Sequence, residues 1–249
     1  SYSRFEYYRM LAWEKKALDR SNLIVTVSHW AYQALLEDYH IPKSRIVVMP
    51  IPSSLPADVI PQQMEAKTIS PDELRLLSVA KDFNMKGIDI SIAATKILRS
   101  KGINAQLRVV GQDGENSDGV EFMGLYKKAD PDMLRGYVSH YEWAHLLIHP
   151  ARYEAAGIVC SEAAAFGAPT ITNAAGGLAT TVKEEVSGMV LPRGSTAEKY
   201  VEAIEGFLND PDRYARMSRT ARERYFEELN WRSMASNILA SFQRMQAGK

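Results

Sequence analysis

Two carboxylates, Glu154 and Glu162, lie eight residues apart in a stretch that also contains the segment Gly157-Ile158-Val159. We expect a helix to begin near Gly157, with Glu154 just before it and Glu162 about one turn inside it. A helix N-terminus presents unpaired N–H groups and a partial positive charge, which suits an anion such as a phosphate. Gly157 lets a ligand approach the backbone closely. Since carboxylates accept the hydrogen bonds that vicinal sugar hydroxyls donate, we predict that both face one cleft that binds a sugar–diphosphate–ribose ligand.

Two cations follow the first strand expected in the larger part of the chain. Lys81 and Lys86 lie in the segment VAKDFNMKG, directly after the predicted strand at 74–79. The loop at the carboxyl end of a parallel strand is where α/β sheets bind ligands. Two ammonium groups there would neutralise a diphosphate leaving group as its charge develops. The alternative is that both lysines are solvated surface residues.

The histidines and the single cysteine carry weaker signals. His145 and His149 lie four residues apart, which on a helix would suggest a metal pair. The run AHLLIHP is typical of a strand and no third ligand is evident, so we expect no metal site. Cys160 is expected to pack in the core helix rather than to act as a nucleophile. A lone cysteine excludes an internal disulfide and favours a reducing, cytoplasmic setting.

The composition suits one large domain, or one domain plus a piece of another. The chain has 249 residues, formal net charge zero and 46% hydrophobic residues, which is ample for a packed core. Zero net charge gives no support for binding to nucleic acid or to an anionic membrane through bulk electrostatics. No run of about 18 apolar residues is present, so we expect no membrane span.

The elements that must position these residues follow from hydrophobic periodicity and from turn residues. Residues 1–50 are expected to form helix–strand–helix–strand, and the five prolines between positions 50 and 71 indicate that residues 51–73 are a linker. Strands alternating with helices over 74–210 predict an α/β fold with a parallel sheet covered on both faces. Residues 211–249 are expected to form two helices. The predicted strands of the larger part are 74–79, 105–110, 120–122, 145–148, 169–172 and 188–191.

The stretch around the two carboxylates resembles the E-x7-E region of retaining glycosyltransferases of the GT-B fold. The similarity is strongest to glycosyltransferase family 4, the glycosyl transferases group 1. In that family the pattern runs roughly P-S-x-x-E-x-x-G, then E-A-x-A-x-G-x-P, followed by a glycine pair. The residues that match it are Pro150, Glu154, Gly157, Glu162, Ala163, Gly167, Pro169, Gly176 and Gly177.

The resemblance implies two Rossmann-like domains that face each other across a cleft. Residues 74–210 would be the nucleotide-sugar-binding domain, and residues 1–50 the last part of the N-terminal, acceptor-side domain. The C-terminal helices, 211–249, would cross back to that first part through the apolar stripe that begins at Trp231. The remainder of the acceptor-side domain would lie ahead of Ser1, so we expect this fragment alone to be inactive.

The resemblance also implies a function. The family transfers a hexose from a nucleotide-diphosphate sugar, UDP- or GDP-linked, to an acceptor with retention of configuration and without a bound metal. Glu162 would hold the ribose and Glu154 would lie beside the hexose. Lys81, Lys86 and the backbone of Gly157, Ile158 and Val159 would hold the diphosphate. Glu154 and Lys86 are the residues that we expect to matter for catalysis.

Two glycine segments resemble family segments whose backbone lies near the nucleotide. Gly111 belongs to the family's V-G-x-G segment and Gly124 to its F-x-G segment, although the first may equally be a simple turn. Tyr126 would either stack on the base or pack internally. Lys81 replaces the family's arginine and Ala151 its serine, and Thr180 stands where an acidic residue is frequent. These departures leave the donor sugar open.

Three alternatives remain open at this point. The chain may be a nucleotide-sugar-binding module without transferase activity, or a sugar-nucleotide epimerase of the same fold. A nicotinamide-dependent dehydrogenase is disfavoured because VAKDFNMKG stands where that class has G-x-G-x-x-G. Expected partners are the nucleotide sugar and a glycan or lipid acceptor, with no nucleic acid. A location at the cytoplasmic face of the membrane would depend on the part ahead of Ser1.

Overall fold

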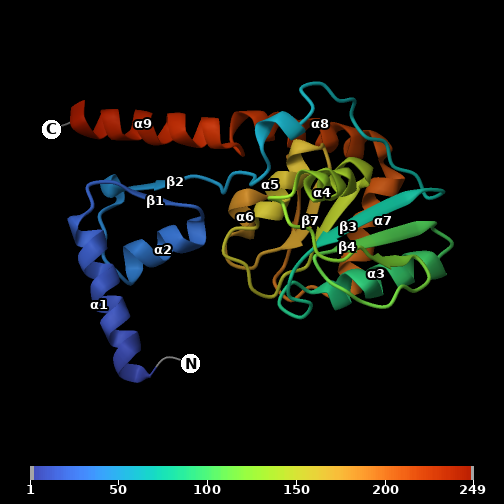
Figure 1. Ribbon diagram of the computed structural model, residues 1–249, viewed down its shortest axis with the longest axis horizontal. Helices are drawn as coiled ribbons and strands as arrows, with labels where there is room; N and C mark the ends of the chain where they lie inside the picture. Colours follow the sequence, from blue (N-terminus) through green and yellow to red (C-terminus); the bar gives the residue numbers. More distant parts are fainter. Residues whose placement is uncertain (1–2, 248–249) are drawn as a thin grey trace.

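The computed structural model describes residues 3–247, and its largest element is a six-stranded, entirely parallel sheet. The strand order is β5-β4-β3-β6-β7-β8 (Figure 1). Because all strands run the same way, their carboxyl ends lie along one edge. The predicted strands are confirmed to within one residue at each end. They are β3 (Leu74–Val79), β4 (Ala105–Val110), β5 (Val120–Phe122), β6 (Leu146–His149), β7 (Thr170–Asn173) and β8 (Gly188–Leu191).

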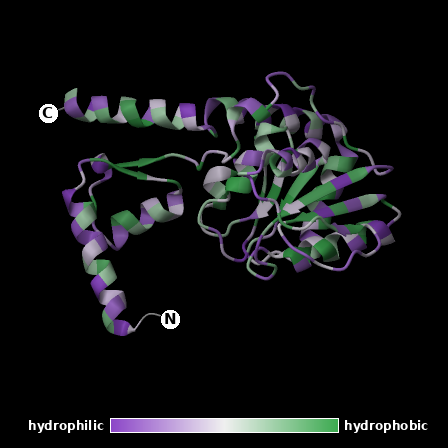
Figure 2. Ribbon diagram, in the orientation of Figure 1, coloured by the Kyte–Doolittle hydropathy of each residue, from purple (hydrophilic) through white to green (hydrophobic). Residues whose placement is uncertain are grey.

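Helices cover both faces of this sheet. One core joins the sheet to α3 (Ile88–Ser100) and α7 (Ala197–Asn209), and includes Leu74 and Leu76. The other core includes Leu77 and Val79 and contains side chains of α4 (Pro131–Trp143), α5 (Ile158–Ala165) and α8 (Pro211–Glu227). Alternate residues of β3 thus enter different cores, as in any sheet buried on both sides. Figure 2 shows the strands as mainly hydrophobic, and the predicted Rossmann-like α/β fold is confirmed.

Residues 3–48 form a smaller unit in the predicted order. It consists of α1 (Arg4–Arg20), β1 (Ile24–Thr26), α2 (His29–Glu37) and β2 (Ile46–Val48), and the two strands pair in parallel. The side chain of Ser28 caps α2 by accepting a hydrogen bond from the backbone N–H of Ala31 at 3.1 Å. Helix α1 has no buried residue, and its partly buried Leu18 packs against the small core of Ile24, Ile41 and Ile46.

The proline-rich segment that joins the two units is packed along the larger one. Apart from the short 3₁₀ helix η2 (Ala57–Val59) it has no regular helix or strand before residue 70, yet Leu55, Ile60 and Ile69 are buried. Lys67 Nζ donates to the backbone oxygens of Tyr141 at 2.8 Å and of Glu142 at 2.9 Å. These contacts satisfy carbonyls at the C-terminal end of α4, which a helix leaves without intrahelical donors.

The last helix, α9 (Trp231–Ala247), projects away from the sheet toward the side on which the smaller unit lies (Figure 1). Met234 is buried, but Trp231, Leu239 and Phe242 are 60%, 58% and 41% exposed. Within residues 3–247 these three side chains are therefore not buried against the first unit, and the expected return of the C-terminal helices to that unit stays a prediction. No helix in this range combines the length and the apolar character that a membrane span requires.

Candidate functional site

The sheet order reverses between β3 and β6, and the chemistry-bearing loops leave the sheet there. Neighbouring strands β3 and β6 are followed by α3 on one face and by α5 on the other. Loops that diverge in this way open a crevice at the carboxyl edge, which is the usual ligand site of open α/β sheets. The β3–α3 loop carries Lys81 and Lys86, and the β6–α5 loop carries Glu154. The sequence therefore placed these three residues at the correct edge.

Lys86 and Glu154 meet across this crevice. Lys86 Nζ lies 2.8 Å from Glu154 Oε2 and 3.3 Å from the backbone oxygen of Tyr153. On the other side of the carboxylate, His149 Nε2 lies 3.1 Å from the same Oε2 atom. Burial by itself would raise the pKa of Glu154, but hydrogen bonds from His149 and Lys86 outweigh it and lower the pKa to about 2. Glu154 is therefore an anion at neutral pH.

Close packing at glycines brings the two loops together. Gly87 has φ of +68°, and a Cβ built on it would lie 2.2 Å from the backbone oxygen of Pro150. Gly176, with φ of +53°, would place a Cβ 1.9 Å from the backbone oxygen of Glu154. Any side chain at either position would push the loops apart, since both distances are far below van der Waals contact. Gly87, which ends the segment VAKDFNMKG, and Gly176, the first of the glycine pair, are thus required by this packing.

Helix α5 begins where the sequence predicted. Gly157 is its N-cap, and no side chain caps the helix. Ile158 follows it and is 40% exposed. The first N–H groups of a helix have no intrahelical acceptor, so an uncapped end of this kind provides positive potential for an anion. The ammonium group of Lys86 contacts Glu154, three residues before this N-cap.

Glu162 differs from the expectation that it faces the cleft. Its side chain is fully buried, and its two oxygens accept four hydrogen bonds. The donors are Ser54 Oγ at 2.5 Å and Lys128 Nζ at 2.6 Å on Oε1, with Tyr137 OH and Tyr141 OH, each at 2.6 Å, on Oε2. Four donors fill the acceptor sites of one carboxylate.

The tyrosines of this network stay protonated. Burial, followed by the charge of Glu162, raises the pKa of Tyr137 and of Tyr141 far above the ordinary value for a phenol. Both therefore remain protonated donors at neutral pH. Ser54 and Lys128 are the donors that reach the surface, since Ser54 is exposed and the Lys128 side chain is 35% exposed. Lys128 Nζ also lies 4.3 Å from the ring centroid of Tyr137. These two donors thus lie between Glu162 and solvent.

The sequence interpretation did not include these partners of Glu162. Tyr137 and Tyr141 are four residues apart on α4, a spacing that places them on one helix face. That spacing was the only available signal, because Ser54 and Lys128 reach Glu162 from 108 and 34 residues away. His149 was considered only as a metal ligand, whereas its position at the end of β6 makes it a partner of Glu154.

The two glycine segments pair with each other. The backbone N–H of Gly111 donates to the oxygen of Gly124 at 2.8 Å, and the N–H of Gly124 donates to the oxygen of Gln112 at 3.2 Å. Tyr126 packs internally, since its hydroxyl lies 2.8 Å from His140 Nε2 and its ring meets that of His140 edge-on. Of the two alternatives for Tyr126, stacking on the base or packing internally, the structure therefore shows internal packing.

The remaining residues singled out in the sequence are dispersed. Lys81 is exposed, and its ammonium group has no hydrogen bond or ion pair within residues 3–247. Thr180 Oγ1 accepts a hydrogen bond from the backbone N–H of His29 at 2.9 Å, which ties α6 (Leu178–Thr181) to the smaller unit. His145 contacts Arg75 rather than His149, with 3.0 Å between its Nε2 and the arginine Nε. Cys160 is buried as predicted, and burial raises the pKa of its thiol.

A protein-family model supports the assignment that these loops suggest. The model described as Glycosyl transferases group 1 matches residues 59–224, which is more than half of the chain. The match covers both loops and the whole six-stranded sheet.

Curated relatives agree with this match. The D-inositol 3-phosphate glycosyltransferase of Corynebacterium aurimucosum is 23% identical over 243 residues, covering 90% of this chain and 57% of the relative. The glycogen synthase of Mycobacterium tuberculosis is 28% identical over 167 residues, covering 65% of this chain and 40% of the relative. The chain thus spans about half the length of the curated relatives that it matches.

Solved structures have the same fold. A glycosyltransferase from Rickettsia africae ESF-5 superposes with a TM-score of 0.68 at 16% identity, over 94% of this chain and 67% of that one. Sucrose-phosphate synthase from Thermosynechococcus elongatus gives a TM-score of 0.63 at 25% identity, over 95% of this chain and 61% of that one. With the sheet, the two loops and the family model in agreement, the chain belongs to the glycosyl transferases group 1, a family of GT-B glycosyltransferases.

Proposed function

We propose that this chain supplies the donor-binding half of a glycosyltransferase that moves a hexose from a UDP- or GDP-linked sugar to a glycan or lipid acceptor with retention of configuration. The observation that carries the proposal is the Lys86–Glu154 contact of 2.8 Å beside the uncapped N-terminus of α5. A cation and free helix N–H groups at one point suit a diphosphate.

Each of these groups has a role in the proposed reaction. The diphosphate lies between Lys86 and the first N–H groups of α5, with Lys81 as a second cation at the rim. As the bond between the hexose C1 and the diphosphate oxygen breaks, negative charge grows on that oxygen and is stabilised by these donors. The acceptor oxygen bonds to C1 on the same face, and its proton passes to the leaving phosphate. No protein nucleophile is required.

Glu154 suits a charge-positioning role in this scheme rather than proton transfer. With its pKa lowered to about 2, the carboxylate is a weak base and has no proton to donate at neutral pH. It holds Lys86 on one side and presents oxygens to hexose hydroxyls on the other. The donor-side role of Glu154 thus depends on its ionised state.

Glu162 is proposed to bind the ribose after an exchange of partners. Since Ser54 and Lys128 already occupy Oε1, a ribose hydroxyl has to replace one of them. Ser54 is the more exposed residue, and its neutral hydroxyl forms a weaker bond to a carboxylate than an ammonium group does. We therefore propose that the ribose replaces Ser54. The glycine backbones at 111 and 124 are proposed to line the base.

A thermal-shift titration tests the proposal directly. Binding of UDP or GDP to the folded chain raises the melting temperature by mass action. We expect a shift with one of these two, little with ADP, and none with NAD. Lys86→Ala and Glu154→Gln should each abolish most of the shift, whereas Lys96→Ala, which removes an exposed lysine on α3, should leave it unchanged. A shift with NAD alone, or an undiminished shift in both site variants, contradicts the proposal.

A further inference from the structure

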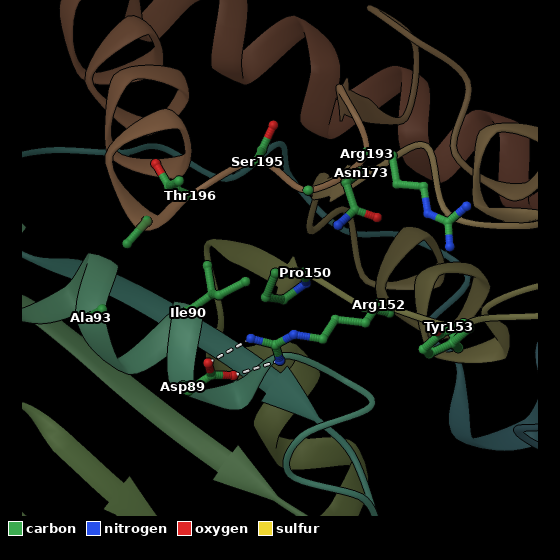
Figure 3. Close-up of a pocket in the computed structure, with 13 residues that line it drawn as sticks. Asp89, Ile90, Ala93, Pro150, Arg152, Tyr153, Asn173, Arg193, Ser195 and Thr196 are labelled. Atoms are coloured by element: carbon green, nitrogen blue, oxygen red, sulfur yellow. Dashed lines mark hydrogen bonds and ion pairs between the residues drawn. The ribbon is translucent and has the colours of Figure 1, made fainter.

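A third side chain links the two loops of the site. Arg152, two residues before Glu154, extends from the β6–α5 loop to Asp89 in the first turn of α3 (Figure 3). The contact is bidentate, with Nη1 at 2.9 Å from Oδ1 and Nη2 at 2.7 Å from Oδ2. Nη1 also donates to the backbone oxygen of Asn84 at 2.6 Å.

The two anchor points of this arginine lie on either side of Lys86. Asn84 is two residues before Lys86 and Asp89 is three residues after it. Between them, the backbone N–H of Arg152 donates to the oxygen of Met85 at 2.8 Å. The turn that carries Lys86 is therefore held at both ends by one guanidinium group, and the loop that holds this group also carries Glu154.

The ion pair has the strength to fix geometry but contributes little to global stability. The planar guanidinium fork matches a carboxylate in two parallel hydrogen bonds, which restrict direction as well as distance. The hydrogen bond from Arg152 lowers the pKa of Asp89, so the pair stays charged at neutral pH. Both side chains are about half exposed, at 42% and 45%, and pairs of this exposure add little to the free energy of unfolding.

We propose that Arg152 is a positioning residue for donor binding: by holding Asn84 and Asp89, it fixes the turn in which Lys86 meets the diphosphate beside Glu154. This inference rests on the proposed function, because it assigns Lys86 to the diphosphate. Arg152 acts through Lys86 and makes no contact with the nucleotide itself.

A double-mutant cycle on nucleotide affinity tests this dependence. The dissociation constant of UDP and of GDP is measured by calorimetry for the wild type, Arg152→Gln, Lys86→Ala and the double variant. We expect Arg152→Gln to weaken binding on the order of tenfold, since small displacements of a binding group are costly. Because Arg152 acts through Lys86, the double variant should bind no more weakly than Lys86→Ala alone. Additive losses would mean that Arg152 binds the ligand directly and would overturn the proposal.

The controls separate positioning from stability. Arg99 makes a comparable two-pronged ion pair with Asp118, at 3.0 and 2.5 Å, near the C-terminal end of α3. Arg99→Gln should leave nucleotide affinity unchanged. The melting temperatures of Arg99→Gln and Arg152→Gln should both lie within a few degrees of that of the wild type. The charge-swapped pair Arg152→Asp with Asp89→Arg should recover part of the affinity that either change alone removes. Unchanged affinity in Arg152→Gln refutes the positioning role alone, whereas unchanged affinity in Lys86→Ala refutes the proposed function as well.

Discussion

Lys128 Nζ lies 2.6 Å from Glu162 Oε1, and this ammonium group is the one positively charged group among the four donors on a fully buried carboxylate. The contact joins the turn before α4 to the second turn of α5, two elements that are not adjacent in sequence. Glu162, the second carboxylate of the E-x7-E pair, is thus part of the packed interior, and it is also the residue proposed to bind the ribose.

The first prediction concerns this contact. Replacing Lys128 with methionine leaves the buried Glu162 with three donors and no counter-charge. We expect the free energy of unfolding to fall by about 1–3 kcal/mol, the usual range for a lost hydrogen bond to a charged group. The midpoint of urea denaturation measures the change. The neighbouring Lys127, which is exposed, provides the control, since Lys127→Met should shift the urea midpoint much less. Equal midpoint shifts in the two variants would refute a stabilising role for the Lys128–Glu162 ion pair.

The second prediction concerns the pH dependence that Glu154 imposes. Its pKa is lowered from 4.5 to about 2, so the folded state holds the ionised form more strongly than the unfolded chain does. The ionised carboxylate therefore stabilises the fold at and above about pH 4.5, and this contribution is lost as the pH falls toward 2. Glu154→Gln removes the titration. The difference in melting temperature between wild type and variant should narrow from pH 6 to about pH 3, and a constant difference would show that Glu154 is not paired.

The third prediction uses two glycines with similar backbone angles. Gly176→Ala places a Cβ 1.9 Å from the backbone oxygen of Glu154, whereas Gly194, with φ of +81°, has no atom within 4 Å of its Cβ position. Both substitutions strain the backbone of a left-handed residue, which costs about 1 kcal/mol, but only the first displaces the Glu154 loop. We expect Gly176→Ala to lose nucleotide binding and Gly194→Ala to retain it, as measured by calorimetry with UDP and GDP. Equal affinities would show that the loop tolerates the clash.

The fourth prediction concerns metal ions. Because Lys86 and the N-terminus of α5 supply positive charge where the diphosphate is proposed to lie, nucleotide binding should not depend on a divalent cation. The thermal shift with UDP or GDP should persist in excess EDTA. Loss of the shift in EDTA and its return with Mg²⁺ or Mn²⁺ would show that a cation bridges the phosphates.

Local sequence was sufficient for the strands and for the two loops of the site. Helical and strand periodicities are local properties, so β3 to β8 were placed to within one residue. Because parallel strands bring their carboxyl ends to one edge, the strand assignments placed Lys86 and Glu154 at that edge, and the family resemblance implied that both lie at the donor. The start of α5 at Gly157 also follows from a local signal, a glycine before a helical run.

Contacts between distant segments were not accessible in this way. Glu162 was expected to face the cleft because the N-terminus of its helix was expected there. The direction of its side chain is instead set by α4 and by the linker, which contribute Tyr137, Tyr141 and Ser54. The same holds for Arg152, whose acceptor at Asp89 lies 63 residues away. Which face of a helix is buried depends on the neighbours that pack against it, and periodicity contains no information about their side chains. The sequence therefore specifies the sheet and the position of the crevice, whereas the packing of distant elements sets which carboxylate is open to a ligand and which is enclosed.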